Sequence, residues 1–141
     1  MIESVPVDDL DNRIEFRIPP DTRFIRVARL AASGVGAGAG LSINRIDDLK
    51  IAVGEVCATL IEIGGGAPIT LGLAYTPAGD VRVDARVPVD DAMHPDGARF
   101  ALTGQILGVI AGDAGFRRGP GSASFAFDVS PTPRAPNPTN N

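Results

Sequence analysis

Two short segments in the middle of the chain alternate apolar and polar residues, and only five residues separate them. The apolar positions are Ile69, Leu71, Leu73 and Tyr75 in the first segment, and Val81, Val83, Ala85 and Val87 in the second. The connection, residues 76–80 (TPAGD), consists of residues typical of turns. This pattern predicts a β-hairpin with one buried and one solvent-exposed face. Because its two strands run antiparallel, the hairpin excludes a purely parallel sheet.

A long amphipathic helix is predicted just before the hairpin. Ser42 or Asn44 can cap its start, and Asp47 and Asp48 lie near its first turn, where carboxylates suit the helix dipole. Its apolar stripe comprises Ile43, Ile46, Leu49, Val53, Val56 and Leu60. Three consecutive glycines at 64–66 end it.

The remaining segments complete an α+β order. Residues 13–18 alternate, which predicts a strand that buries Ile14, Phe16 and Ile18. A helix follows, capped by Asp21 or Thr22, and the glycine-rich run 34–40 is predicted to be a loop. A third helix from 98 to about 113 and a strand over 124–129 follow. The order β-α-α-β-β-α-β predicts a mixed, mostly antiparallel sheet with helices packed on one face.

The domain boundaries follow from composition. With 141 residues, the chain has the size of one domain. We expect an N-terminal arm over 1–12, a folded domain over 13–130 and a disordered tail over 131–141, which is rich in proline and poor in apolar residues.

Charge and cysteine content restrict the function. The net charge of −4 argues against a nucleic-acid partner, since nucleic-acid binders usually carry a basic face. The apolar runs are too short to cross a bilayer, so no membrane partner is expected. No secretory signal is recognised, and the single Cys57 cannot form an internal disulfide. These features predict a cytoplasmic protein.

The predicted helix carries the motif that points to a family. Residues 46–61 read IDDLKIAVGEVCATLI. This segment resembles the corresponding helix of RsbW-type anti-sigma factors, members of the histidine-kinase-like (GHKL, or Bergerat) ATPase superfamily, which commonly read D-L-x-x-A-V-x-E-x-C/A-x-N there. The resemblance extends in element order over about residues 12–130. The chain is also similar to divergent actinobacterial anti-sigma factors that share Glu-Val-Cys and lack the following asparagine.

The resemblance implies roles for two residues of this helix. Glu55 matches the family's general base, and Thr59 falls where the family has its Mg²⁺-binding asparagine. A threonine hydroxyl is a weaker, shorter neutral ligand than an amide carbonyl, so Thr59 is at best a weak Mg²⁺ candidate. The alternative for Glu55 is a solvated glutamate with no catalytic role.

Two further nucleotide-binding elements depart from the family pattern. Where the family carries Asp-x-Gly to read adenine, this chain has residues 86–90 (RVPVD), so Asp90 or Asp91 can substitute only if the loop shifts. The second glycine-rich element corresponds to residues 97–104 (GARFALTG), which is not a phosphate cradle of that type. The resemblance therefore implies a degenerate ATP site, a vestigial Glu55 and no cofactor.

Other residues that suggest chemistry have simpler interpretations. The glycine run 34–40 lacks the Lys-Ser/Thr of a P-loop, and Cys57, with only His94 as a base, is expected to be a buried structural cysteine. Arg23, Arg26 and Arg29 recur every three residues on the first helix. The family places partner contacts on this helix, so these arginines are candidates for protein docking; the alternative is a solvated face.

The preferred function is an anti-sigma factor that sequesters an alternative sigma factor and is regulated by an anti-anti-sigma partner. The first alternative is an active ATP- and Mg²⁺-dependent serine kinase that phosphorylates the anti-anti-sigma factor. The second is a structural or small-molecule-sensing domain that keeps only the fold. Relatives are homodimers, so a homodimer through the first strand and helix is predicted.

Overall fold

The computed structural model describes residues 12–133. The N-terminal arm, up to residue 11, and residues 134–141 of the predicted tail lie outside this range. The helical elements are a 3₁₀ turn η2 (Thr22–Phe24), α1 (Ile25–Gly38), α2 (Ile43–Ile63) and α3 (Ala98–Ile110). The strands are β1 (Ile14–Ile18), β2 (Ile69–Tyr75), β3 (Val81–Pro88), β4 (Gly112–Gly119) and β5 (Ser122–Val129).

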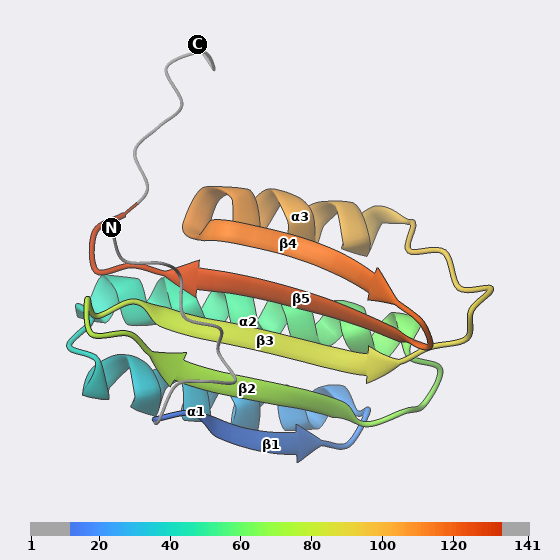
Figure 1. Ribbon diagram of the computed structural model, residues 1–141, viewed down its shortest axis with the longest axis horizontal. Coiled ribbons are helices and arrows are strands. Elements are labelled where there is room, and N and C mark those ends of the chain that lie inside the picture. The colour runs from blue at the N-terminus through green and yellow to red at the C-terminus, as the bar shows by residue number, and fades with distance from the viewer. Residues whose placement is uncertain (1–11, 134–141) are drawn as a thin grey trace, which may run out of the picture.

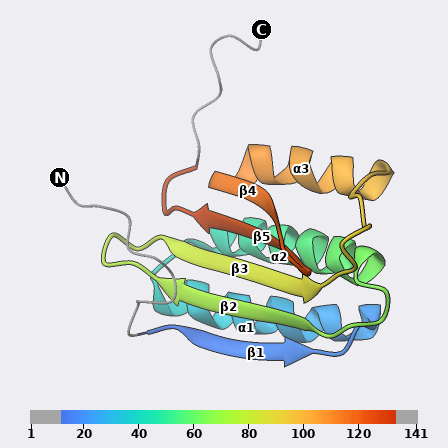
Figure 2. The ribbon, with the colours of Figure 1, turned by 45° about the vertical axis from the view of Figure 1, so that its right-hand side comes forward.

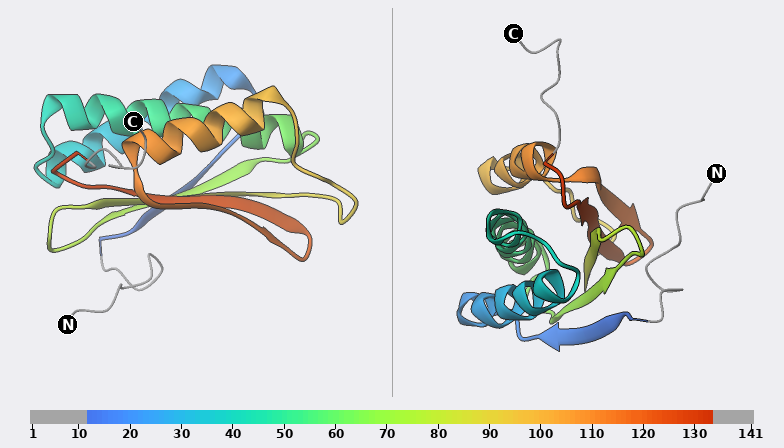
Figure 3. Two further views of the ribbon diagram at one scale, coloured as in Figure 1. Left: turned by 90° about the horizontal axis from the view of Figure 1, so that it is seen from above. Right: turned by 90° about the vertical axis from the view of Figure 1, so that its left-hand side faces the viewer.

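The strands form one sheet in the order β1-β2-β3-β5-β4, and all neighbours are antiparallel (Figures 1 and 2). The three helices cover one face of this sheet, with α2 between α1 and α3 (Figure 3). The predicted α+β class with helices on one face is confirmed. The sheet differs from the prediction in having one additional strand, β4, and no parallel pair among the described strands.

The hairpin of β2 and β3 is the centre of the sheet. Leu71 pairs with Ala85 and Leu73 with Val83, and all four side chains are buried under the helices. On the opposite face, Gly72 is also buried, because the guanidinium of Arg13 lies where a Cβ of residue 72 would be. The predicted hairpin is confirmed, and its outer face is partly covered.

Helix α2 begins and ends as its sequence predicts. The Ser42 side chain accepts a hydrogen bond from the backbone N–H of Arg45, and the N–H of Gly64 bonds to the carbonyl of Leu60. The central stripe residues Leu49, Val53, Val56 and Leu60 are fully buried. Ile43 is 78% exposed, so its predicted burial is wrong. It is the first residue of α2.

Helix α1 corrects the prediction for the glycine run. Residues 34–38 are helical, and only Gly40 adopts a positive φ, of 85°. A Cβ on Gly36 would lie 3.2 Å from Leu49 Cδ2 and 3.3 Å from Ile46 Cγ1. Glycine at 36 therefore lets α1 and α2 approach closely, and this packing offsets the low helix propensity of the segment.

Strand β4 was not predicted, and α3 is correspondingly shorter. The segment 112–119 reads GDAGFRRG, whose glycines disfavour a strand in isolation. It forms one because β5 offers an unpaired edge, with Phe116 opposite Phe125. Arg118 strengthens the attachment by donating to the carbonyls of Asp90 and Asp91 in the preceding loop.

Candidate functional site

Glu55 lies in the middle of α2 and faces the first turn of α3. Its Oε2 is 3.8 Å from Nη1 of Arg99, whose Nε is 3.4 Å from Oε2 of Glu62. The 3.8 Å separation is too long for a hydrogen bond, and this buried Oε2 has no hydrogen-bond partner among the described residues. The carboxylate at the expected position of the base is therefore held beside a guanidinium.

Thr59 lies one turn beyond Glu55 and is completely buried. Its Oγ1 is 2.7 Å from Oγ1 of Thr103 on α3, which is also completely buried. The Thr103 hydroxyl additionally lies 3.4 Å from the carbonyl oxygen of Glu55. The Thr59 hydroxyl thus bonds α2 to α3 and does not face solvent, where a hydrated ion would meet it.

Asp90 and Asp91 lie in the loop between β3 and α3 and are exposed. Asp90 Oδ1 accepts from the N–H of Ala92 at 2.9 Å, and Asp91 Oδ1 accepts from the N–H of Gly121 at 3.2 Å. Arg118 donates to the carbonyls of this loop, including that of Met93. The hydrogen bond of Asp90 stays within its own loop and that of Asp91 reaches the turn between β4 and β5, so neither bond joins these carboxylates to Glu55 or Thr59.

The stretch 97–104, which corresponds to the family's second glycine-rich element, is helical after its first residue. Gly97 has a φ of 95° and precedes α3, which begins at Ala98. Residues 98–104 form the first two turns of that helix, and Phe100 packs its ring against Phe116 at a centroid distance of 5.0 Å. The backbone of these residues is therefore engaged in α3 rather than forming an open glycine loop.

The three arginines of the first helical segment have different surroundings. Arg23, in η2, donates to the Asp21 carboxylate at 2.7 Å, and this bond lowers the pKa of Asp21. The stem of Arg29 lies over Gly54 of α2, whose Cβ would be 3.5 Å from Arg29 Cδ. Arg26 is exposed. An exposed apolar strip, formed by Phe24, Val27 and Leu30, accompanies them on η2 and α1.

Arg45 is a structurally important residue that sequence reasoning missed. It is only 4% exposed and donates to the carbonyls of Ser130 and Ile110 and to the carboxylate of Asp48, at 2.8–3.1 Å. It thus joins the start of α2 to the ends of β5 and α3. The only sequence signal is the Arg–Asp spacing of three, which is common on solvated helices.

Cys57 is confirmed as a buried cysteine. Its side chain is fully inaccessible, and burial raises the pKa of the thiol to about 12. Within residues 12–133, no three metal-binding side chains of His, Cys, Asp or Glu gather in one place. No helix in the same range combines the length and apolar content of a bilayer-spanning segment.

Comparisons with known proteins point to one group. No protein-family model matches the chain. The serine-protein kinase RsbW of Halalkalibacterium halodurans is 34% identical over 62 residues, which cover 44% of this chain and 38% of that protein. RsbW of Bacillus velezensis and of Bacillus subtilis are 39% and 37% identical over 49 residues, 35% of this chain and 31% of each relative. The chain is similar to RsbW.

The similarity covers less than half of this chain and less than half of each relative. The matched part corresponds to about a third of the length of these RsbW proteins. Together with the α+β fold, the match supports the RsbW-like relationship that the motif around Glu55 predicts. It does not by itself assign the activity of RsbW to this chain.

Proposed function

We propose that this chain is a bacterial anti-sigma factor of the RsbW type. It sequesters an alternative sigma factor, an anti-anti-sigma partner regulates it, and its nucleotide site is degenerate. The relationship is supported by the partial identity to RsbW proteins. The main support for a degenerate nucleotide site is the buried hydrogen bond between Thr59 and Thr103.

The degenerate site rests on the surroundings of its expected members. The hydroxyl of Thr59 is completely buried and bonded to Thr103, so a hydrated divalent ion could reach it only if α2 and α3 separated. The carboxylate of Glu55 lies beside the guanidinium of Arg99, at 3.8 Å between Oε2 and Nη1. The local contacts of Asp90 and Asp91 favour a structured loop over an adenine-reading group. Each feature favours protein binding without catalysis.

The protein-binding role rests on the exposed surface of α1. Phe24, Val27 and Leu30 are 38%, 46% and 67% exposed, and Arg26 is exposed beside them. Apolar side chains rimmed by arginine are typical of protein interfaces. We assign this strip, with Arg23, Arg26 and Arg29, to contacts with a sigma factor or with a second copy of the chain.

The alternative is an active serine kinase of the anti-anti-sigma factor. It is favoured by the name of the relatives, serine-protein kinase, and by the presence of Glu55 at the position of the base. This alternative requires ATP and Mg²⁺, whereas the anti-sigma function without catalysis requires neither. The proposal further places the protein in the cytoplasm, among divergent actinobacterial-type members, with no nucleic-acid or membrane partner.

Co-expression with the alternative sigma factors of the cell, followed by size-exclusion chromatography, tests the proposal. We expect one sigma factor to co-elute stoichiometrically at micromolar concentration. Val27→Asp on α1 should abolish co-elution, whereas Val109→Asp, at a 77% exposed position of α3, should not. If none of the sigma factors co-elutes with the parent chain, the anti-sigma proposal is wrong.

A further inference from the structure

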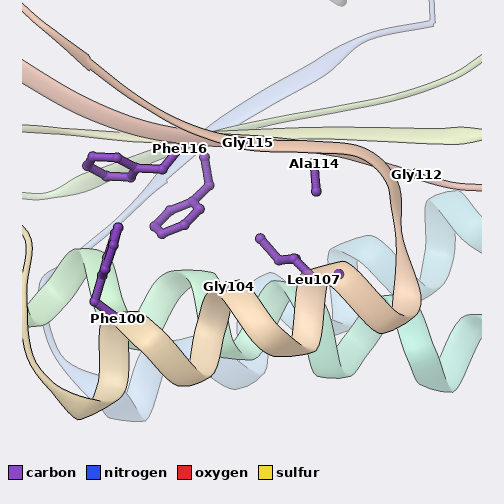
Figure 4. A pocket seen from close by; sticks show the side chains of 9 residues that line it. Phe100, Gly104, Leu107, Gly112, Ala114, Gly115 and Phe116 are labelled. Atoms are coloured by element: carbon purple, nitrogen blue, oxygen red, sulfur yellow. The ribbon is translucent and has the colours of Figure 1, made fainter. Parts of the chain in front are cut away.

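A pocket of about 580 Å³ lies between α3 and β4, apart from the contacts of Glu55 and Thr59 (Figure 4). Leu107 and Gly104 line it from α3, and Ala114 points into it from β4. Its size lies within the range of roughly 300–1,000 Å³ that is usual for small-molecule sites. No feature of the proposed anti-sigma function requires this pocket.

The pocket exists because β4 is irregular. Gly112 pairs with Asp128, but Gly115 pairs with Ala126, so β4 contains one residue more than β5 over this interval. Such a bulge bends a strand locally, and bulges are common beside binding sites. The bent strand stays paired to β5 while leaving space between itself and α3 (Figure 4).

The glycines of α3 keep this space open. A Cβ on Gly104 or Gly108 would meet no heavy atom within 4 Å. By contrast, a Cβ on Gly36 would press against Leu49 at 3.2 Å, so helix packing explains that glycine. Glycine is less stable than alanine in a helix interior, and at 104 no packing requirement offsets this cost. The absence of a side chain at 104 leaves the pocket open on the α3 side.

Aromatic rings form one end of the pocket. The ring of Phe116 lies 5.0 Å from the rings of both Phe100 and Phe125, at angles of 86° and 62°. Phe125 is buried, whereas Phe100 and Phe116 are partly exposed, so these two rings can meet a further aromatic ring. The described lining includes no charged side chain, so an ionic ligand would lose hydration without compensation.

We propose that this pocket binds an uncharged, largely apolar small molecule that contains an aromatic ring. The ring stacks edge-to-face in the cluster of Phe100, Phe116 and Phe125, and the remainder lies along Gly104 and Leu107. Binding does not depend on ATP, on a metal ion or on a protein partner. The inference is therefore independent of the proposed anti-sigma function.

Titration with the neutral fluorophore N-phenyl-1-naphthylamine tests the proposal on the full chain. We expect saturable fluorescence enhancement with one probe per chain. Gly104→Leu places a side chain in the open space and should weaken binding at least tenfold, with a melting temperature equal to or above that of the parent. Gly34→Leu is the matched control, because Gly34 is a helical glycine of α1 with equally open surroundings. It should bind the probe as the parent does.

A second variant protects the test against misfolding. Ala114→Leu fills the pocket from β4 without changing α3, and it should also weaken binding at least tenfold. The proposal is overturned if the parent shows no saturable binding below about 100 µM probe, which is about tenfold tighter than a millimolar dissociation constant. It is equally overturned if a folded Gly104→Leu or Ala114→Leu variant binds as tightly as the parent.

Discussion

The hydroxyls of Thr59 and Thr103 lie 2.7 Å apart, and both residues are completely buried between α2 and α3. The Thr103 hydroxyl also lies 3.4 Å from the carbonyl oxygen of Glu55, so it has a second partner. The Thr59 hydroxyl is bonded to Thr103 and depends on it for hydrogen bonding.

This dependence predicts a non-additive pair of substitutions. Thr103→Val should lower the free energy of unfolding by about 1–3 kcal/mol, because the buried Thr59 hydroxyl loses its partner. Thr59→Val should cost less, because the Thr103 hydroxyl keeps the carbonyl of Glu55 as an acceptor. The double variant should cost clearly less than the sum, since valine has nearly the same shape and leaves no unpaired hydroxyl. Urea unfolding of the four proteins measures the coupling, and strict additivity would contradict the mutual role of the two hydroxyls.

The second prediction concerns the buried Arg45. Arg45→Met leaves the carboxylate of Asp48 and the carbonyls of Ser130 and Ile110 without their donor. We expect a loss of about 1–3 kcal/mol in the free energy of unfolding, mainly from the two carbonyls that lose their donor, because the Asp48 carboxylate is 37% exposed and water can solvate it. Arg26→Met is the control, and at its exposed position it should change stability by less than about 0.5 kcal/mol. Equal effects of the two substitutions would refute the structural role of Arg45.

The third prediction follows from the raised pKa of Cys57, about 12 against a usual value of 9.0. The folded protein keeps the thiol protonated where the unfolded chain releases the proton. The resulting stability is fully present below pH 9 and is lost as the pH rises from 9 towards 12. Between pH 8.5 and 10, the parent should lose about 1 kcal/mol more unfolding free energy than Cys57→Ala. Equal losses in urea unfolding would show that the thiol is not protected.

The fourth prediction concerns assembly. If the apolar strip of α1 pairs two chains, light scattering at tens of micromolar should give twice the 14.6 kDa chain mass. Leu30→Glu should then give the mass of one chain, because a buried, unpaired carboxylate is strongly unfavourable in an apolar interface. Val109→Glu on α3 serves as the control and should remain dimeric. A parent mass near 14.6 kDa under these conditions would argue against the homodimer.

Much of the fold was predictable because its signals are local. The alternation in β2 and β3 and the apolar stripe of α2 each span enough residues to specify an element and its buried face. Strand β4 was not predictable in this way. Its glycine-rich sequence forms a strand only because β5 presents an edge, and that edge is known only from the assembled sheet.

The candidate site likewise combines a local signal that the sequence shows with contacts between distant residues that it does not show. The position of Glu55 on α2 follows from helical periodicity, but the hydrogen bond between Thr59 and Thr103 joins residues 44 positions apart. No pattern in the sequence indicates which threonine will face which. The pocket between α3 and β4 was missed for a related reason. Glycines at 104 and 108 disfavour a helix by their propensity, whereas in the structure they belong to α3 and line an open space.

The last prediction is that ATP binds weakly or not at all. A working site of this superfamily needs a metal ligand, an adenine-reading carboxylate and open amides around the phosphates. Here Thr59 is bonded to Thr103, the carboxylates of Asp90 and Asp91 are engaged locally, and residues 98–104 are helical. Each lost charged contact costs about 1.5–3 kcal/mol. Losing two moves a micromolar dissociation constant towards the millimolar range, at about tenfold per 1.4 kcal/mol.

Isothermal titration with ATP and Mg²⁺ measures this affinity directly. The matched variants are Glu55→Ala and Glu62→Ala, because both glutamates lie on α2 and both contact Arg99. If the site is degenerate, the parent and both variants should show no binding tighter than about 50 µM. Tighter binding that Glu55→Ala or Thr59→Ala abolishes and Glu62→Ala preserves would support the kinase alternative. In that case the Thr59–Thr103 bond would have to open on ATP binding, because only then can the threonine hydroxyl reach a metal ion.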